Sequence, residues 1–436
     1  MAADADTMSW LYSLESRGEV YRLERMEHAL GLIGNPHRRL QAVHIAGTKG
    51  KGSVAAMLDA MLRAAGYRTG LYTKPHLVRL TERTRISGAE MPAELLLDYV
   101  TRLRPIFDRA GLALTFFEFT VALMFLYFAD SAVDAAVIET GLGGRLDSTN
   151  VVRPMLSVIT SIGFDHMDRL GNTLAEIARE KGGIIKRDVP AVVGARAPEA
   201  RQVLCGMAHQ LNSPTQLIDR DFGYVSRAPA HRIDYQGCDL HLRDVEVNLA
   251  GPCQHENAAI ALAAAEALRA AGWRLEEHAI RRGLADVVWP GRFEVVSRDP
   301  LVIFDCAHNE LSIAALLETM RLELGEAVRP RLLFACLADK QWREMAGLLA
   351  PHVSSVVLTT VRPKRSLEPE YLVPLFAPHV PAKVVRDPLQ AIENVMGEAR
   401  TDEVILVAGS VYLIGDVYPW FLERQGRRAL FPEAAL

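Results

Sequence analysis

Short apolar runs alternate with longer runs of helical period along almost the whole chain. AVHIAG (42–47) is followed by SVAAMLDAMLRAAG (53–66), where apolar residues recur every three or four positions, and then by RTGLYT (68–73). The alternation continues through VDAAVIET, MLSVITSI and PAVVGA. Apolar runs that alternate with amphipathic helices are typical of βαβ units. The pattern therefore predicts an α/β fold with a mostly parallel sheet covered by helices.

Two interruptions suggest how the chain is organised. Residues 215–250 alternate apolar and polar positions with a period of two, which predicts a small antiparallel insert. VVWPGRF (287–293) then interrupts the pattern, and the α/β rhythm restarts in LVIFDC, RLLFACL, SSVVLTTV and DEVILVAGS. We therefore predict a first domain over residues 1–289, which contains the insert, and a second, smaller domain over residues 290–436.

Composition narrows the classes of function. The 436 residues are 50% hydrophobic and carry a net charge of −4 without long basic runs, which argues against nucleic acid or a membrane surface as the main partner. The longest apolar stretch, 120–138, contains Asp130 and Asp134 and does not resemble a membrane span. Five scattered cysteines and an acidic N-terminus indicate a cytoplasmic protein, and its expected partners are small molecules.

The loop at residues 47–53, GTKGKGS, lies between a predicted strand and a predicted helix. Backbone N–H groups at such a helix start can hold a phosphate, Lys51 can add positive charge, and Ser53 can reach a magnesium ion. The spacing departs from the usual phosphate loop, because Ile45 replaces its first glycine and Gly52 separates the lysine from the serine. The residues alone therefore fit both a phosphate loop and a flexible basic turn.

Two polar residues follow later strands of the same predicted sheet. Glu139 ends the run VDAAVIE, at the position where phosphate-loop enzymes place an acid that holds magnesium. His166 follows MLSVITSI, at the carboxyl edge where ligands of α/β sheets collect. An exposed strand-end acid and a purely structural histidine are the alternatives, and the neighbouring loop favours the metal role for Glu139.

Lys181 lies on the apolar side of a predicted helix. Thr173 and Glu176 form a capping box that opens this helix, and Lys181 follows Leu174 by seven residues, on the same stripe as Ile177. Burial would lower the pKa of the amine, and a neutral amine can capture carbon dioxide as a carbamate. The pattern alone favours the alternative, in which the long side chain extends its charge to solvent.

The second predicted domain repeats the arrangement. LVIFDCAHN places Asp305 at a strand end, with His308 and Asn309 close behind. These residues suit a ligand site at a sheet edge, and they equally suit a polar loop that caps the next helix. Arg292, just beyond the predicted boundary, can reach across a cleft between the domains or lie exposed in the linker.

In their order and spacing, these stretches resemble the folylpolyglutamate synthase family, including its bifunctional bacterial type that is also a dihydrofolate synthase. This is the folate branch of the Mur ligase superfamily. The resemblance is collinear over nearly the whole chain and rests on HIAGTKGKGS, YTKPHLVRLTERTRISG, FFEFT, ETGLGGRLDSTN, TSIGFDHMDRLG, EKGGIIK, QHENAA, WPGRFEVV, FDCAHN, LADK and VAGSVYLIGDV. The family's loop reads Gly-Thr-x-Gly-Lys-Gly-Ser/Thr, so Gly52 belongs to its pattern.

The resemblance implies an N-terminal phosphate-loop ATPase domain and a smaller C-terminal Rossmann-like α/β domain, with ATP and the substrates meeting between them. It implies that ATP phosphorylates a carboxylate of a pteroate or folate, and that the amino group of L-glutamate then attacks the acyl phosphate. It also implies a monomer that requires Mg²⁺. Two alternatives are a Mur-type ligase for another carboxylate and amino acid, and a nucleotide-binding relative that has lost catalysis.

The resemblance further implies roles for individual residues. Those implied to bind ATP are Thr48, Lys49, Gly50, Lys51, Gly52, Ser53, Asn257, Arg292 and Asp305. Those implied to hold magnesium are Ser53, Glu139 and His166. Those implied to act in catalysis are Lys51, Asp147, His166, His308 and a carbamylated Lys181. Those implied to contact the pterin substrate are Thr115, Phe116, Phe117, Glu118, Leu146, Asp147 and Ser148.

The chain departs from the family pattern at four positions. Many relatives carry a serine that ligates magnesium where this chain has Lys74, and an ammonium group cannot ligate a metal. Lys74 would instead contact a phosphate or the glutamate substrate. The other departures are Cys306, Glu310 and Gln341.

Overall fold

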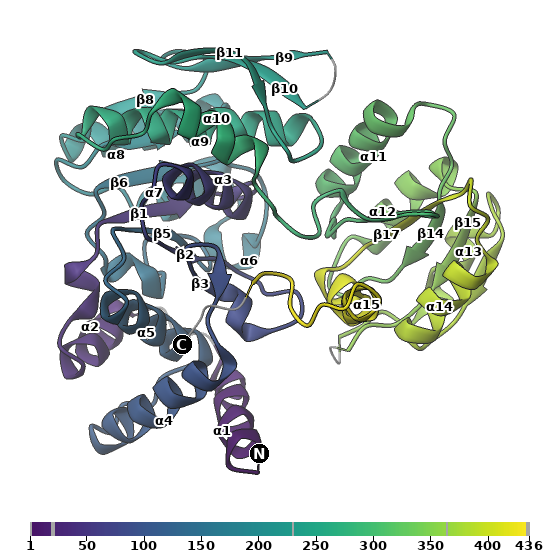
Figure 1. The fold of residues 1–436 in the computed structure, drawn as a ribbon, viewed down its shortest axis with the longest axis horizontal. Coiled ribbons are helices and arrows are strands. Elements are labelled where there is room, and N and C mark those ends of the chain that lie inside the picture. Colours follow the sequence, from purple (N-terminus) through teal and green to yellow (C-terminus); the bar gives the residue numbers. More distant parts are fainter. Residues whose placement is uncertain (1, 19–21, 229–230, 363–364, 433–436) are drawn as a thin grey trace.

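The computed structural model describes residues 2–18, 22–228, 231–362 and 365–432. The chain forms two α/β units, each with a sheet that has helices on both faces (Figure 1). A separate three-stranded sheet lies on the outside of the first unit. The predicted α/β fold with a mostly parallel sheet is therefore confirmed.

The sheet of the first unit has eight strands in the order β4-β3-β2-β5-β1-β6-β7-β8. The six parallel strands are β1 (Ala42–Ala46), β2 (Thr69–Tyr72), β5 (Ala135–Glu139), β6 (Leu156–Ile159), β7 (Ala191–Val193) and β8 (Thr215–Leu217). The antiparallel edge strands are β3 (Thr84–Ile86) and β4 (Ala89–Glu90). Because β5, β1 and β6 are neighbours, the loops at their carboxyl ends meet at one edge of the sheet.

Helices cover both faces of this sheet, so its central strands are apolar on both sides. Val43 and Ile45 face a core shared with α3 (Lys51–Ala64), α9 (Pro252–Ala270) and α10 (Glu277–Ala285). Ala42 faces the other core, shared with α1 (Ala2–Ser13), α2 (Leu23–Leu32), α4 (Ala93–Arg109) and α5 (Phe116–Asp130). A further core packs α7 (Leu174–Gly182) and α8 (Pro198–Gln210) against β6 and β7, and α6 (Met167–Leu170) precedes α7.

The most apolar stretch of the sequence is core rather than a membrane segment. It begins in α5, whose residues are buried nearly all round because the helix packs among the sheet and the neighbouring helices. Within the described ranges, no helix is both long and apolar enough to cross a membrane.

The outer sheet is antiparallel and lies within the range predicted for the insert. Its strands are β9 (Gly223–Arg227), β10 (Arg232–Gln236) and β11 (His241–Glu246), in the order β11-β10-β9. Its buried face packs on α9, where the hydroxyl of Tyr235 donates to Glu266 at 2.9 Å. Thr215–Leu217, at the start of the predicted range, belongs instead to the parallel sheet as β8.

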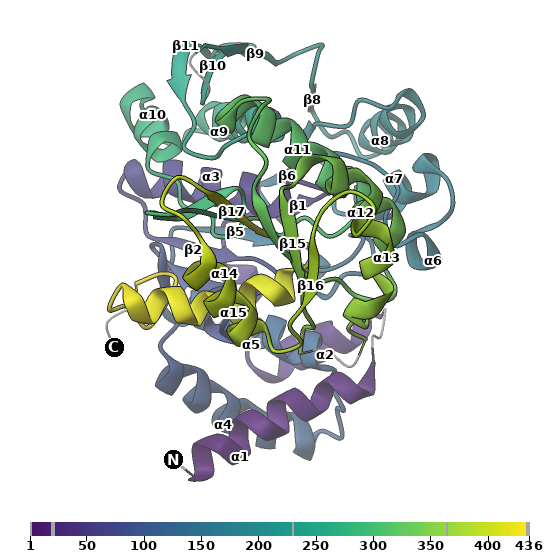
Figure 2. The same cartoon turned by 90° about the vertical axis from the view of Figure 1, so that its right-hand side faces the viewer.

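The second unit, which faces the viewer in Figure 2, has a six-stranded sheet in the order β12-β13-β17-β14-β15-β16. The antiparallel edge strand is β12 (Glu294–Arg298), and the parallel strands are β13 (Leu301–Phe304), β14 (Arg331–Phe334), β15 (Ser355–Leu358), β16 (Ala382–Val384) and β17 (Val404–Ala408). One face packs against α11 (Glu310–Leu324), α12 (Trp342–Leu349) and α13 (Val373–Phe376). The other packs against α14 (Pro388–Glu398) and α15 (Val411–Arg424).

The end of the chain returns to the first unit (Figure 1). The backbone N–H of Phe431 donates to Glu90 Oε1 at 3.2 Å, and the N–H of Glu90 donates to the carbonyl of Pro432 at 2.7 Å. Helix α15 also lies close to the segment after β2, since a Cβ added to Gly415 would stand 2.1 Å from the carbonyl oxygen of Leu77. These contacts connect the second unit to the β3–β4 edge of the first.

Candidate active site

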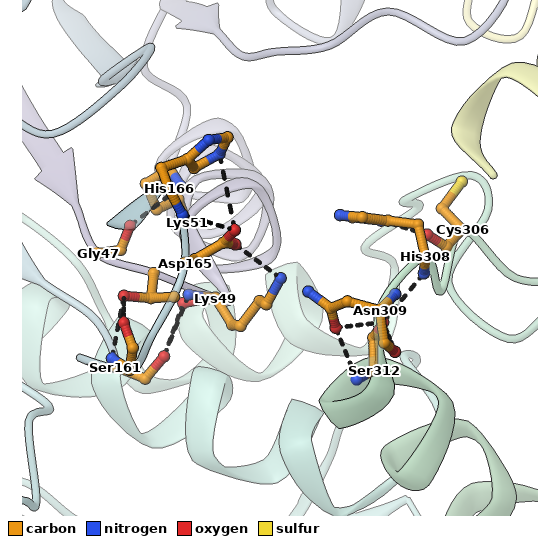
Figure 3. Close-up of polar contacts among 12 residues, drawn as sticks. Gly47, Lys49, Lys51, Ser161, Asp165, His166, Cys306, His308, Asn309 and Ser312 are labelled. Atoms are coloured by element: carbon orange, nitrogen blue, oxygen red, sulfur yellow. Dashed lines mark hydrogen bonds and ion pairs between the residues drawn. The ribbon is translucent and has the colours of Figure 1, made fainter. Parts of the chain in front are cut away.

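A cavity of about 980 Å³ lies between the two units. The first unit contributes the loop after β1, the segment after β2 and the loops after β5 and β6, and the second contributes the loops after β13 and β14. Figure 3 shows side chains from the loops after β1, β6 and β13. The cavity thus forms where the carboxyl ends of both parallel sheets face each other, which is where α/β proteins bind ligands.

The loop after β1 wraps the start of α3 closely. Gly50 precedes the helix with φ of 84°, and a Cβ added to it would stand 2.1 Å from Asn257 Oδ1. Gly47 is equally confined, since its added Cβ would meet Thr160 Oγ1 at 1.8 Å. The ammonium of Lys51 curls back and donates to the carbonyl of Gly47 at 3.1 Å. The loop therefore combines a helix N-terminus with positive charge, as an anion site requires.

We expect Gly50→Ala to abolish detectable nucleotide binding while the protein stays folded. The left-handed backbone disfavours a Cβ, and the added atom would displace Asn257 from the loop. Titration calorimetry with ADP and Mg²⁺ would measure the loss. Gly206→Ala is the matched control, because Gly206 lies inside α8 with nothing within 4 Å of the added Cβ. Unchanged ADP affinity in Gly50→Ala would contradict the assignment of the loop.

The loop after β6 fastens the loop after β1. The Thr48 hydroxyl accepts from the N–H of Gly163 at 3.0 Å, and Lys49 Nζ lies 3.0 Å from Asp165 Oδ2. Burial would raise the pKa of Asp165, but Lys49 and His166 outweigh it and hold the pKa at about 2. This ion pair joins residues 116 positions apart, so no local pattern in the sequence could have indicated it.

Glu139 ends β5 beside this loop, and its carboxylate is buried. Its Oε2 accepts from the N–H of Lys74 at 3.1 Å, and its Oε1 lies 4.0 Å from Lys51 Nζ. Burial raises the pKa of the carboxyl, and the positive charge of Lys51 opposes this rise. A buried carboxylate at the cavity wall is a suitable ligand for a cation.

The donors present fit Mg²⁺ rather than a metal held by the protein alone. Within the part of the chain that the structure describes, no three His, Cys, Asp or Glu side chains are grouped to hold a metal. Mg²⁺ is typically bound by one or two carboxylates, with phosphate oxygens and water completing its shell. Glu139 supplies such a carboxylate next to the glycine-rich loop after β1.

His166 also lines the cavity, at the start of α6. Its backbone is left-handed with φ of 50°, its ring is half-exposed, and Nε2 lies 3.8 Å from Asp165 Oδ1. Burial lowers the pKa of the imidazole, although Asp165 opposes the shift. The neutral ring can therefore present a nitrogen lone pair toward the cavity at neutral pH.

Lys181 is buried, and its side chain does not extend to solvent. It is 4% exposed, and Nζ donates to the carbonyl of Gly47 at 2.9 Å. Burial, reinforced by the charge of Lys51, lowers the pKa of the amine to about 7. The predicted capping box of Thr173 and Glu176 at the start of α7 is confirmed.

The second unit presents His308 and Asn309 to the opposite side of the cavity (Figure 3). His308 Nδ1 donates to the carbonyl of Cys306 at 2.8 Å, which leaves Nε2 as an acceptor. Burial lowers the pKa of His308 to about 4, so the ring is neutral at pH 7. Asn309 caps α11, where its Oδ1 accepts from the N–H of Ser312 at 3.0 Å.

Arg292 and Asp305 lie behind these residues. Arg292 lines the cavity and donates to the carbonyl of Gly291 at 3.0 Å. Asp305 does not line it, and its carboxylate accepts from the N–H groups of Phe293 at 2.9 Å and Ala307 at 2.7 Å. Burial raises the pKa of Asp305, and Arg292 opposes the rise. Asp305 thus holds the turn that carries Arg292.

The two stretches predicted to contact a pterin lie outside the lining of the main cavity. Phe117 packs on Gly141, whose added Cβ would stand 2.4 Å from the ring, and Lys74 Nζ lies 5.4 Å from the ring centroid. Asp147 is buried, and its carboxylate accepts from the N–H groups of Leu142 at 2.8 Å and Thr149 at 3.0 Å. Half-buried Leu146 and buried Ser148 flank it.

Thr115 and Glu118 form a capping box at the start of α5. The buried carboxylate of Glu118 accepts from the N–H of Thr115 at 2.8 Å and from both Nε and Nη2 of Arg25, at 2.9 and 3.0 Å. Phe116 is buried under the guanidinium of Arg83, which lies 5.5 Å from its ring centroid. The ion pair of Arg25 and Glu118 thus anchors α2 to the start of α5.

We expect Glu118→Gln to lower the free energy of unfolding by ~2 kcal/mol, because it leaves a bidentate, mostly buried guanidinium partner without its charge. Urea unfolding followed by circular dichroism would measure the change. Glu277→Gln is the control, since it breaks only an exposed pair with Arg281 and should change stability by no more than ~0.5 kcal/mol. Equal effects of the two substitutions would contradict the anchoring role.

Several lining residues were not predicted from the sequence. They are Arg85, Trp289, Phe431, Asp339, Lys340 and Arg365. Lys74 and Gln341 also line the cavity, and the sequence analysis noted them only as departures from the family pattern. Asp339 and Arg365 pair at 2.8 Å, and a Cβ added to Gly52 would meet the ring of Trp289 at 2.8 Å. Their side chains reach the cavity from segments far apart in sequence. Arg85, Trp289, Asp339 and Lys340 lie in stretches that carry the family resemblance, but no role was assigned to them.

Comparisons with known proteins cover both units. Residues 45–265 match the family described as the Mur ligase middle domain, and residues 291–411 match the Mur ligase, glutamate ligase domain. The dihydrofolate synthase/folylpolyglutamate synthase of Bacillus subtilis is 35% identical over 94% of this chain and 97% of its own length. The folylpolyglutamate synthase of Lacticaseibacillus casei is 37% identical over 82% of this chain and 85% of its own.

Solved structures agree in fold. A folylpolyglutamate synthase from Thermotoga maritima superposes with a TM-score of 0.86 at 34% identity, covering 96% of this chain and 97% of that one. Escherichia coli FolC in complex with DHPP and ADP gives a TM-score of 0.86 at 31% identity, covering 96% and 98%.

Proposed function

The chain belongs to the folylpolyglutamate synthase family of the Mur ligases, and from that premise we propose that it joins L-glutamate to a pteroate or folate carboxylate with hydrolysis of ATP. The observation that supports this most strongly is the cavity, where the glycine-rich loop and Glu139 of one unit face His308 of the other. We divide the chain functionally at residue 290, into an ATPase domain and a ligase domain.

We place the triphosphate of ATP at the start of α3, with Thr48–Ser53 around it. The close fit of Asn257 against Gly50 supports a second contact to the nucleotide from α9. Arg292 and Asp305 belong to the second domain, so Arg292 reaches ATP only when the two domains are together, and Asp305 acts through the turn that it holds. Such assembly excludes water, which protects a reactive acyl phosphate from hydrolysis.

The reaction is a phosphoryl transfer followed by an acyl transfer. A carboxylate oxygen of the acceptor attacks the γ-phosphorus of ATP, and ADP leaves. The amino group of L-glutamate then attacks the acyl carbon, phosphate leaves, and the amine loses a proton. His308 can take that proton at Nε2, because its Nδ1 is already committed as a donor. Glu139, His166 and Ser53 would hold Mg²⁺, which would supply positive charge against the phosphates of ATP.

We assign the acceptor's pterin to the segments around Phe117 and Asp147. They lie next to the cavity through Gly141 and Leu142, which line it. Lys74, on the cavity wall above Phe117, supplies positive charge at the junction of the two sites. This supports a contact from Lys74 to a phosphate or carboxylate, in place of the metal contact made by serine in many relatives.

We also propose that Lys181 carries a carbamate. Its neutral amine attacks carbon dioxide, forms an N–C bond and releases a proton, which converts a buried amine into an anion. The lowering of the pKa to about 7 by burial supports this, because the amine can then lose its proton near neutral pH. We further propose a cytoplasmic monomer, and the five free cysteines support a reducing compartment.

The test is phosphate release by purified protein with ATP, Mg²⁺ and L-glutamate, comparing dihydropteroate with tetrahydrofolate as acceptor. Activity with both acceptors indicates a bifunctional enzyme, and activity with tetrahydrofolate alone indicates chain extension only. No release above background with either would contradict the proposal. Lys74→Ser would then distinguish a degenerate site, which that change should repair, from a ligase for another acceptor.

A further inference from the structure

Arg85 is a buried charge without a counter-ion. It lies on β3, lines the cavity and is 3% exposed. Among the described residues, no carboxylate lies within 4 Å of its guanidinium, and Nε has no hydrogen-bond partner. Its one hydrogen bond is from Nη2 to the hydroxyl of Thr73 at 3.4 Å. Buried guanidinium groups are almost always paired, so Arg85 needs a partner that the described residues do not supply.

Two aromatic rings enclose the guanidinium. Its central carbon lies 3.9 Å from the ring centroid of Phe431 and 4.9 Å from that of Trp289. The ring faces attract the positive charge, but they do not replace hydrogen-bond acceptors at the N–H edges. The rings therefore hold the guanidinium in a fixed plane and leave its donors available.

The acids nearest to this charge are engaged elsewhere. Asp59 pairs with Arg63 at 2.8 Å, and Glu82 accepts from the three backbone N–H groups of residues 77–79. Glu90 accepts from the hydroxyl of Thr81 at 2.9 Å. Burial lowers the pKa of Arg85 only to about 10, with these acids opposing the shift, so the guanidinium remains charged at neutral pH.

We propose that Arg85 binds a substrate carboxylate in the cavity, either that of the incoming amino acid or that of the acceptor. A planar guanidinium with free N–H groups suits a carboxylate, which can accept two parallel hydrogen bonds. A phosphate of the nucleotide is the poorer match, because the ring of Trp289, 4.9 Å from the guanidinium, also lies against the glycine-rich loop, where a Cβ added to Gly52 would stand 2.8 Å from it. The assignment rests on the proposed ligase function.

The site depends on both domains. β3 belongs to the first domain, Trp289 lies next to the proposed boundary, and Phe431 arrives with the C-terminal segment that pairs with Glu90. Arg85 is therefore held in place only when the second domain is seated against the β3–β4 edge. This would couple carboxylate binding to assembly of the active site.

The test is Arg85→Met, which keeps the apolar stem of the side chain and removes the guanidinium and its charge. We expect the KM for either L-glutamate or the acceptor to rise at least about tenfold and the KM for ATP to change less than about twofold. Which of the two KM values rises identifies the source of the carboxylate. Arg85→Lys should recover part of the affinity, because an ammonium keeps the charge without the planar pair of donors.

Stability separates this role from a structural one. A buried guanidinium without a counter-ion destabilises the ligand-free protein, because its charge is removed from water without a compensating partner. Arg85→Met should therefore leave the Tm unchanged or raise it. The control is Arg104→Met, which removes a guanidinium 4.5 Å from the ring centroid of Trp10 on the surface, away from the cavity, and should change no KM. A lower Tm with unchanged KM values would overturn the proposal, as would a rise confined to the KM for ATP.

Binding measurements keep the test independent of turnover. L-Glutamate and tetrahydrofolate would be titrated calorimetrically into wild-type protein and Arg85→Met, each with ADP and Mg²⁺ present. If Arg85→Met no longer binds one of the two ligands that the wild-type protein binds, the proposed carboxylate contact of Arg85 is supported. This holds even if the wild-type protein releases no phosphate, and in that case only the ligase function fails. Equal binding by both proteins, or binding by neither, overturns the role of Arg85.

Discussion

Lys51→Met is expected to lower kcat for phosphate release by about 1,000-fold, equivalent to ~4 kcal/mol of transition-state stabilisation. The ammonium lies 3.1 Å from the Gly47 carbonyl and 4.0 Å from Glu139 Oε1, between the phosphate-binding loop and the proposed metal ligand. Charge on the transferring phosphoryl group grows at this point in the transition state, where a fixed positive charge has the largest effect. Methionine keeps the length of the side chain and removes the charge.

The split between kcat and KM tests this assignment. Loss of a group that acts mainly in the transition state lowers kcat more than it raises the KM for ATP. Lys383→Met is the control, because that lysine pairs with Glu398 on the exposed surface of β16 and should leave both parameters unchanged. A decrease of kcat by less than about tenfold would show that Lys51 does not contact the transferring group.

The parts of the site that the sequence predicted are those with a local pattern. The loop at Gly47–Ser53 could be predicted because a strand, several glycines and a helix follow one another in the sequence. Glu139 could be predicted because it ends an apolar run. The position of Lys181 was only partly predictable. The helical period placed it on the apolar side of the helix but could not show whether its ammonium group reached solvent. The fold answers that question, because Lys181 lies under the carbonyl of Gly47, from a segment 134 residues earlier.

The parts that could not be predicted depend on contacts between distant segments. The two rings that enclose the Arg85 guanidinium come from the chain before β12 and from the C-terminal end, and no local pattern links either segment to β3. The same holds for the pair of Lys49 and Asp165. The family resemblance implied roles for Thr115 and Glu118, but only the structure shows that they also fasten α5 to Arg25, outside the cavity lining.

Lys181→Ala is expected to reduce turnover to below about 1% of wild type, and added bicarbonate should not restore it, because the group that captures carbon dioxide is gone. Lys181→Met distinguishes loss of function from loss of fold. Burial lowers the pKa of the amine from 10.5 to about 7, so the folded state binds the proton less tightly than the unfolded state. The wild-type protein therefore loses stability as the pH falls from 10.5 to about 7, and the methionine variant should not.

Protonation of the Lys181 amine should also make formation of the carbamate depend on pH. Only the neutral amine reacts with carbon dioxide, so capture should weaken as the pH falls below about 7 and the amine becomes protonated. Wild-type protein supplied with ¹³C-bicarbonate should show a carbamate resonance by NMR at pH 8 that decreases at pH 6, in parallel with turnover. Lys181→Met provides the matched blank for that resonance. Turnover of Lys181→Ala close to wild type, or a resonance that persists in the methionine variant, would remove the Lys181 carbamate from the mechanism and leave the lysine as a buried donor to Gly47.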